Sequence, residues 1–280
     1  MFRPSDIIID AFIERMRWAY SQQYGDGEFG HRETIAQVAR MALGRLSQSD
    51  ALYHNLDHTL LVTMVGHDIL RGKIVRDGRV ASHDWVNFVC SLLCFAVGFY
   101  RHACPGDDDE RCVVDESGAT VEVPAGVTDG WLWAYFTDRG KIFVRHHFAD
   151  HPVLDAETLA ANIEYSRFPP PVDRNPDTDT FPGLLRAAHI IGAVADPNFK
   201  LKMPALMQEL DESGMTERLG YQTVTEFRAQ YPELFWQTLH PLIVDAVALL
   251  DHTGQGREWI ANMHAHLLAE EHRGDIKKSY

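Results

Sequence analysis

Residues 53–58 read Tyr53-His54-Asn55-Leu56-Asp57-His58, and the interpretation of the whole chain starts from this stretch. His54 and His58 are four residues apart, so on a helix they lie on one face and can serve one site. Such a pair is typical of metal ligands or of an acid and a base. It also arises by chance in a chain with 15 histidines, so the pattern needs support from residues elsewhere in the sequence.

Charge limits the partners of this protein. The 280 residues include 26 Lys and Arg against 40 Asp and Glu, which gives a net charge of −14. This charge repels a phosphate backbone, and no basic cluster offsets it. We therefore expect no nucleic acid as a partner, apart from small nucleotides.

The first residues, Met1–Asp6, lack the apolar run that is typical of a signal peptide, and no stretch approaches the about 20 apolar residues of a membrane span. The cysteines lie in one quarter of the chain without a paired C-x-x-C pattern, which favours free thiols over a metal site. They are Cys90, Cys94, Cys104 and Cys112. We expect a cytoplasmic protein without a membrane partner, and the sequence gives no indication of its oligomeric state.

Apolar residues recur at helical spacing through most of the chain. Residues 84–98 are apolar on almost every side, which is typical of a helix at the centre of a domain. No internal repeat or linker divides the chain, so the sequence predicts a single all-α domain over residues 1–280. The predicted helices cover residues 6–20, 33–46, 55–70, 84–98, 130–147, 155–166, 181–195, 197–209, 224–230, 233–250 and 256–271.

Two segments interrupt the helical pattern. Residues 104–128 are rich in Pro, Gly and Asp, and Val113-Val114 and Val121-Glu122-Val123 flank Glu116-Ser117-Gly118. This arrangement predicts a small β-hairpin inserted into a helical body. Residues 169–180 are rich in Pro and Asp and predict a long loop of the kind that often covers or binds a substrate.

The stretch at 53–58, followed by the apolar Leu60-Leu61-Val62, resembles the Tyr-His-Asn-x-x-His segment of HD-domain phosphohydrolases and cyclic-nucleotide phosphodiesterases. The resemblance implies an HD-like helical bundle in which His58 is a metal ligand and His54 a general acid, with Asn55 supporting the site. A bacterial subgroup of metal-dependent phosphohydrolases is similar to residues 101–107 and to the late helices as well.

The resemblance continues at two later segments, where the expected metal ligands differ. Residues 92–98 stand at the place of the family's apolar helix ending in His-Asp-x-Gly, but Phe95-Ala96 replaces the His-Asp pair. His189 stands where the family has a metal-binding Asp. A divalent cation needs several N or O ligands to replace its water, so we expect no metal centre of the family type.

Other histidines offer a rebuilt metal site. A three-histidine centre suits zinc or iron, and His58 and His189 would be its first members. His102, His146, His147 and His151 are further candidates, although a helix end or loop explains them equally well. Arg101, Lys141 and Arg145 can bind an anion but are also ordinary surface charges.

Two acidic motifs compete with this interpretation. His67-Asp68 looks like the missing His-Asp pair. His67 follows His58 by nine residues on the same predicted helix, which places it on the opposite side of that helix. We therefore interpret His67-Asp68 as a surface pair. Asp196 follows His189 by seven residues and can share its face. Because Pro197 comes next, we predict instead that Asp196 caps a helix beginning at Pro197.

Two functions follow from these patterns. In the first, an HD-like protein without the family metal centre uses a pocket at His54, His58, Phe95 and His189 to bind a small organic or anionic ligand, or a partner, without hydrolysing it. The pocket would be lined by Phe95, Ala96, Phe99, Arg101, His102 and His189. In the second, the protein is an enzyme. It is then a phosphohydrolase with a remodelled His-rich zinc or iron site, or a catalyst that uses His54, Asn55 and His58 without metal.

Overall fold

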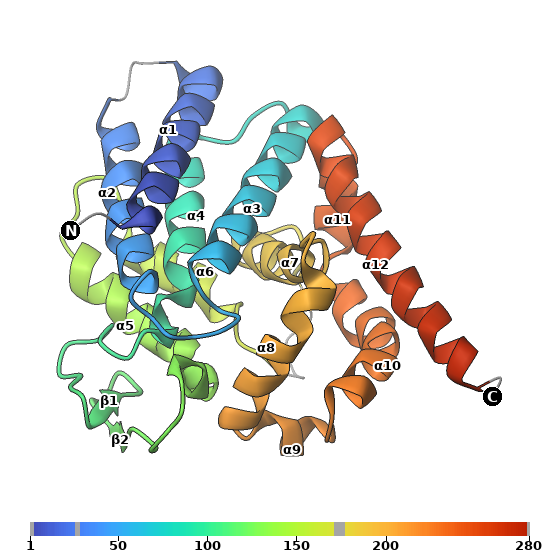
Figure 1. The fold of residues 1–280 in the computed structure, drawn as a ribbon. Coiled ribbons are helices and arrows are strands. Elements are labelled where there is room, and N and C mark those ends of the chain that lie inside the picture. The colour runs from blue at the N-terminus through green and yellow to red at the C-terminus, as the bar shows by residue number, and fades with distance from the viewer. Residues whose placement is uncertain (1–2, 26–28, 171–176, 279–280) are drawn as a thin grey trace.

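The computed structural model describes residues 3–25, 29–170 and 177–278. Its secondary structure is 71% helix and 2% strand, so the predicted all-α class is confirmed. Half of the predicted loop at 169–180, residues 171–176, lies outside the described residues. In Figure 1, α3 crosses the middle of the molecule, between the N-terminal helices α1, α2 and α4 on one side and α11 and α12 on the other.

Most predicted helices form with ends shifted by a few residues. The N-terminal half contains α1 (Pro4–Tyr24), α2 (Phe29–Leu46), α3 (Leu56–Asp77), α4 (Ser82–Cys94), α5 (Phe136–Phe148) and α6 (Ala156–Glu164). The C-terminal half contains α7 (Phe181–Val194), α8 (Phe199–Glu212), α9 (Met215–Leu219), α10 (Val224–Leu234), α11 (Val244–Leu250) and α12 (Gly254–Lys278). Short turns of other helical types are η1 (Phe95–Phe99), η2 (Asp129–Ala134), η3 (Phe235–Leu239) and η4 (His240–Leu242).

The apolar segment Ser82–Phe99 lies in the core. Its mean hydropathy of 1.2 and its length of 18 residues would suffice to cross a membrane, although 83% of it is buried inside the protein. The prediction of one helix over 84–98 is wrong at its end, because α4 stops at Cys94 and the chain tightens into the 3₁₀ turn η1. This turn carries Phe95 and Ala96, both completely buried.

The predicted hairpin is confirmed as β1 (Arg111–Val113) and β2 (Thr120–Glu122), which pair antiparallel with Cys112 opposite Val121. A buried guanidinium attaches this insertion to the helices. Arg139 donates from Nε to the carbonyl of Gly98 at 2.8 Å and forms an ion pair with Asp107 at 3.0 Å. Because Arg139 is completely buried, its carbonyl and carboxylate partners offset the cost of removing the charge from water.

The C-terminal part differs most from the prediction. The expected helix over 233–250 is instead a series of η3, η4 and α11. Pro241 lacks a backbone N–H and cannot continue an α-helix from the preceding turn. The short helix α9, between two glycines with positive φ (Gly214 and Gly220), was not predicted.

Buried apolar side chains form one cluster that reaches from Ile9 in α1 to Leu267 in α12. A small second cluster lies under the hairpin and includes Cys112, Trp131 and Leu132. The four cysteines are buried and unpaired, as the expectation of free thiols requires. The single-domain assignment agrees with the continuous core but stays a prediction.

Candidate metal and ligand site

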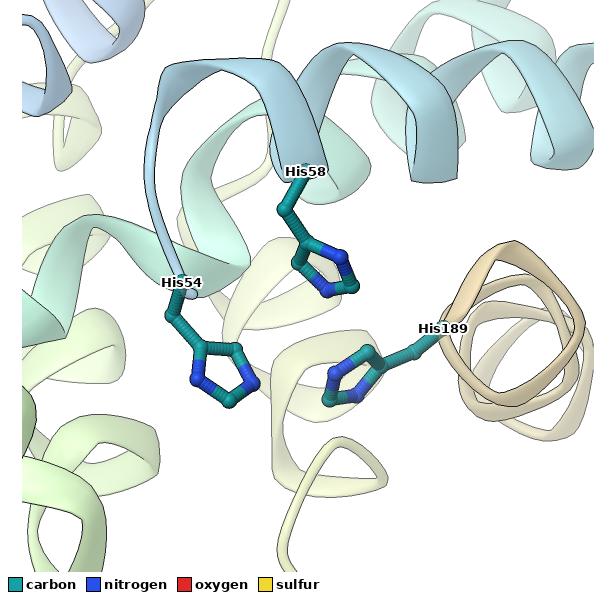
Figure 2. Close-up of side chains that lie close together, drawn as sticks. All are labelled: His54, His58 and His189. Atoms are coloured by element: carbon teal, nitrogen blue, oxygen red, sulfur yellow. The ribbon is translucent and has the colours of Figure 1, made fainter. Parts of the chain in front are cut away.

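Three histidines from two separate parts of the chain point toward one another (Figure 2). His54 precedes α3, His58 is in its first turn, and His189 is on α7. One ring nitrogen from each lies within 4.8 Å of those of the other two. Because a zinc–imidazole bond is about 2.0–2.1 Å long, small side-chain rotations can bring three such nitrogens to one ion.

His54 and His58 do not share a helix, which corrects the reason given for their pairing. The helix begins at Leu56, and Asn55 is its N-cap. The Asn55 side chain accepts a hydrogen bond from the His58 backbone N–H at 3.2 Å and donates to the carbonyl of Leu52 at 2.9 Å. Asn55 therefore supports the site by fixing the turn that directs both rings inward.

A glutamate that the sequence analysis missed orients His54. Oε2 of Glu209, on α8, lies 2.7 Å from Nδ1 of His54. Oε1 of Glu209 accepts hydrogen bonds from the backbone N–H groups of Tyr53 and His54, at 2.6 and 3.2 Å. Glu209 is completely buried. A Cβ on Gly130 would lie 2.4 Å from Cγ of Glu209, so the carboxylate reaches this position only beside a glycine.

His58 has two unused nitrogens. Both Nδ1 and Nε2 are buried and have no hydrogen-bond partner within the described part of the chain. Burial, together with the charges of His54, His189 and Lys202, lowers the pKa of His58 well below its usual range. Burial and then His54 lower the pKa of His189 to about 3. Both rings are therefore neutral near pH 7 and can offer lone pairs.

Close packing of α3 against α7 brings the third histidine into place. A Cβ on Gly192 would lie only 2.9 Å from Cγ2 of Val62, so a larger residue would push the two helices apart. His58 and His189 have ring centroids 5.3 Å apart. His189 thus lies beside the 53–58 stretch.

Aromatic rings surround the cluster. Phe99 stacks on His54 with a centroid distance of 4.2 Å, and Trp133 meets the same ring edge-on at 4.6 Å. Phe95 lies 4.9 Å from His189. Ala96 is buried in the same turn. Among the predicted pocket residues, Phe95, Phe99 and His189 therefore lie together at the cluster. Phe95, Ala96 and Phe99 were nevertheless wrongly expected to line the cavity, because all three are completely buried behind it and only His189 is part of its wall.

Arg101 and His102 were expected in the pocket, and the structure does not bring them there. Arg101 pairs with the buried Asp129 and lies 3.4 Å from Asp50. His102 is 38% exposed and lies 3.5 Å from Asp109. Arg101 and His102 lie outside the pocket because the chain turns away from it after η1, toward the hairpin insertion.

The remaining candidates serve structural contacts. Lys141 pairs with Glu164 and Arg145 with Glu157, each at 2.7 Å. His147 Nε2 lies 3.2 Å from Arg45. Two further histidines, His146 and His151, lie in the same region, at the end of α5 and just beyond it.

Two interpretations made from the sequence were wrong in part. His67 and Asp68 face away from the cluster as predicted, but they are buried. The His67 ring meets Trp85 of α4 edge-on, and Trp259 of α12 donates to Asp68 at 2.9 Å. Asp196 does not cap a helix beginning at Pro197, since α8 begins at Phe199 after the N-cap Asn198. The Asp196 carboxylate accepts from the Asn198 backbone and pairs with Lys202 instead.

A cavity of about 760 Å³, including the part open to solvent, lies beside the cluster. His54, His189 and Trp133 line one side of it, and Arg186 lies on the same face of α7 as His189. The opposite walls are apolar side chains from α8, α10, η3 and η4: Leu206, Leu210, Phe227, Leu234, Leu239 and Leu242. Apolar walls facing a few polar side chains are typical of a site for a small organic molecule.

Comparison with known protein families gives a match over most of the chain. The family described as Npun_R2479-like matches residues 2–273. The chain belongs to the Npun_R2479-like family. This match covers both α3 and α7, so all three histidines lie in the Npun_R2479-like region. The search of curated proteins found no match, and the search of solved structures found none.

Proposed function

We propose that His54, His58 and His189 bind one transition-metal ion, zinc or iron, and that the protein is a metal-dependent hydrolase acting on a small organic molecule in the adjoining cavity. The observation that carries this proposal is His58, whose two buried ring nitrogens have no partner among the described residues. An unpaired buried polar group costs about 1–3 kcal/mol, and a metal ion would supply the missing partner.

The surroundings fit a metal as well. Metal-binding histidines commonly donate their second N–H to a carboxylate, which fixes the ring and strengthens the ligand. Glu209 stands in this relation to His54, so Nε2 of His54 would be the ligand atom. Bound by three imidazoles, a zinc ion can act as a Lewis acid and lower the pKa of a bound water.

Residues around the cluster orient one ligand and shield it from water. Glu209 holds His54 in one orientation, and Phe99 and Trp133 keep water from its faces. His54 and His189 both line the cavity, so a substrate bound there would touch the cluster. The apolar walls would select a substrate with an apolar body.

The HD-like interpretation of the fold belongs to this proposal. Its support is the position of Phe95, which the resemblance aligns with a metal-binding histidine. The Phe95 ring lies 4.9 Å from that of His189 and 6.4 Å from that of His58. The closeness of residue 95 to the candidate metal site supports an HD-like arrangement.

Elemental analysis of protein produced with zinc and iron in the medium tests the proposal. We expect one zinc or iron ion per chain, lost in His58→Ala and His189→Ala. His102→Ala, at an exposed histidine outside the cavity, is the matched control and should keep the metal. Titration of the metal-free protein with Co²⁺ gives a second measurement, since its visible absorption reports the ligands without requiring activity.

A folded wild-type protein that binds neither zinc, iron nor Co²⁺ would overturn the metal proposal. The second candidate function, a pocket that binds an organic ligand without metal, would then remain. The observation that favours it is the replacement of two expected ligands by Phe95 and Ala96, which are apolar and completely buried.

A further inference from the structure

Arg186 has an unused hydrogen-bonding edge. Its side chain is 7% exposed, and neither Nε nor Nη2 has a hydrogen-bond partner among the described residues. The guanidinium lies over the ring of Tyr165, with Cζ 5.2 Å from the centroid. This contact occupies the flat face of the group and leaves its N–H edge free.

In other arginines of this chain, the Nε–Nη2 edge of the guanidinium binds a carboxylate. Arg145 donates from Nε and Nη2 to the two oxygens of Glu157, at 2.8 and 2.7 Å. Three other arginines make the same paired contact, namely Arg76 with Asp77, Arg167 with Glu164 and Arg228 with Glu270. Two parallel N–H groups match the two oxygens of a carboxylate. Arg186 has the same edge, but the described part of the chain gives its Nε and Nη2 no carboxylate partner.

Arg186 is part of the cavity wall, and its Nε and Nη2 are themselves covered from solvent. Arg186, His189, Ile190 and Ala193 all line the cavity, and their spacing puts them on one face of α7. Arg186 precedes His189 by three residues, which is about 4.5 Å along the helix axis. A group bound to Arg186 would therefore lie close to the histidine cluster.

Polar groups in the cavity also favour a ligand that accepts hydrogen bonds. Within the described residues, the buried lining atoms without a partner are Nε and Nη2 of Arg186 and Nε1 of Trp133. All three are donors. The cavity surface is otherwise mainly apolar, so the matching ligand has an acceptor at one end and an apolar remainder.

We propose that the Nε–Nη2 edge of Arg186 binds the carboxylate of a largely apolar organic acid in this cavity. The proposal names the ligand class for the site of the proposed function, and it rests on the cavity and not on the metal. The carboxylate lies at Arg186, near the histidines, and the apolar part extends between α8, α10 and η3.

Titration calorimetry with octanoate, octanol and octyl phosphate tests this assignment. We expect metal-free wild-type protein to bind octanoate at least tenfold more tightly than octanol. Arg186→Met keeps the length and burial of the side chain without its donors, and should lose at least tenfold in octanoate affinity with little change for octanol. Arg145→Met, at an arginine outside the cavity, should bind as wild type does.

Octanoate that binds no better than octanol to the wild-type protein would overturn the proposal, whether or not the variants fold. Binding of octyl phosphate without octanoate would overturn the assignment to a carboxylate. His58→Ala separates the two proposals: it should lose metal but keep octanoate binding, whereas Arg186→Met should keep metal. Arg186→Lys gives a second folded variant and should bind octanoate more weakly than wild type.

Discussion

Nδ1 of His54 lies 2.7 Å from Oε2 of Glu209, although 155 residues separate them in sequence. Both side chains are buried, at 1% and 0% exposure. The same carboxylate also accepts from the backbone of Tyr53 and His54. Glu209 thus fixes both the ring and the turn before α3, which makes it the main support of the candidate metal site.

Glu209→Gln should weaken metal binding by about 10- to 100-fold, the usual effect of removing a carboxylate behind a histidine ligand. Glutamine keeps the size and can still accept from the backbone, but it lacks the charge that strengthens His54. Competition with a chelator measures the affinity. The matched control is Glu212→Gln on the same helix, whose carboxylate accepts from the Thr128 backbone at 3.1 Å. Equal losses in both variants would contradict a specific role for Glu209.

Replacing Phe95 by His and Ala96 by Asp should increase metal affinity. The ring at position 95 lies 4.9 Å from that of His189, so the new imidazole would add a ligand to the cluster. A change in the visible spectrum of the Co²⁺ form checks this. Phe88→His, at another buried phenylalanine of the same region, should leave the spectrum unchanged. The triple variant adds His189→Asp to these two changes. If it folds but gains no metal affinity, the alignment with the HD-domain pattern is wrong.

His189 should make the metal-free protein less stable in acid. Burial lowers its pKa from 6.5 to about 3 in the folded state, so between these values only the unfolded chain takes up the proton. The free energy of unfolding therefore decreases as the pH falls below 6.5, by about 1.4 kcal/mol per pH unit. From about pH 7 to about pH 5 this residue should contribute a loss of about 2 kcal/mol.

Urea unfolding of wild type and His189→Asn at the two pH values checks this prediction. The variant has no titrating group at this position, so its stability should decrease less between the two conditions. An equal decrease in both proteins would show that other groups cause the acid sensitivity.

Arg139→Met should destabilise the protein by about 3–5 kcal/mol, because it leaves the Asp107 charge buried without its partner. Arg139 and Asp107 are 0% and 1% exposed. Chemical denaturation measures the change. Arg111→Met on β1 is the control. Its side chain is 58% exposed and lies 4.0 Å from Glu122, so its loss should change stability by less than about 1 kcal/mol. Similar effects of the two substitutions would contradict the role of Arg139.

The sequence by itself determined the local features of this protein. Apolar residues at helical spacing specify the helices, because burying one face of a helix requires that period. The valines around Glu116-Ser117-Gly118 specify the hairpin. The 53–58 stretch located one part of the site, and the resemblance pointed to His189. These signals lie in short segments, so they can be read without knowing how the helices pack.

Tertiary packing decided which of these residues act together. Glu209 belongs to an amphipathic helix that looks ordinary in the sequence, and it reaches His54 only because α8 packs beside Gly130. Arg101 leaves the expected pocket because the chain turns toward the insertion, and Arg186 faces a cavity without an acidic partner among the described residues. Such contacts join segments far apart in the chain. They depend on how closely the helices approach, which the local pattern of apolar and polar residues does not encode.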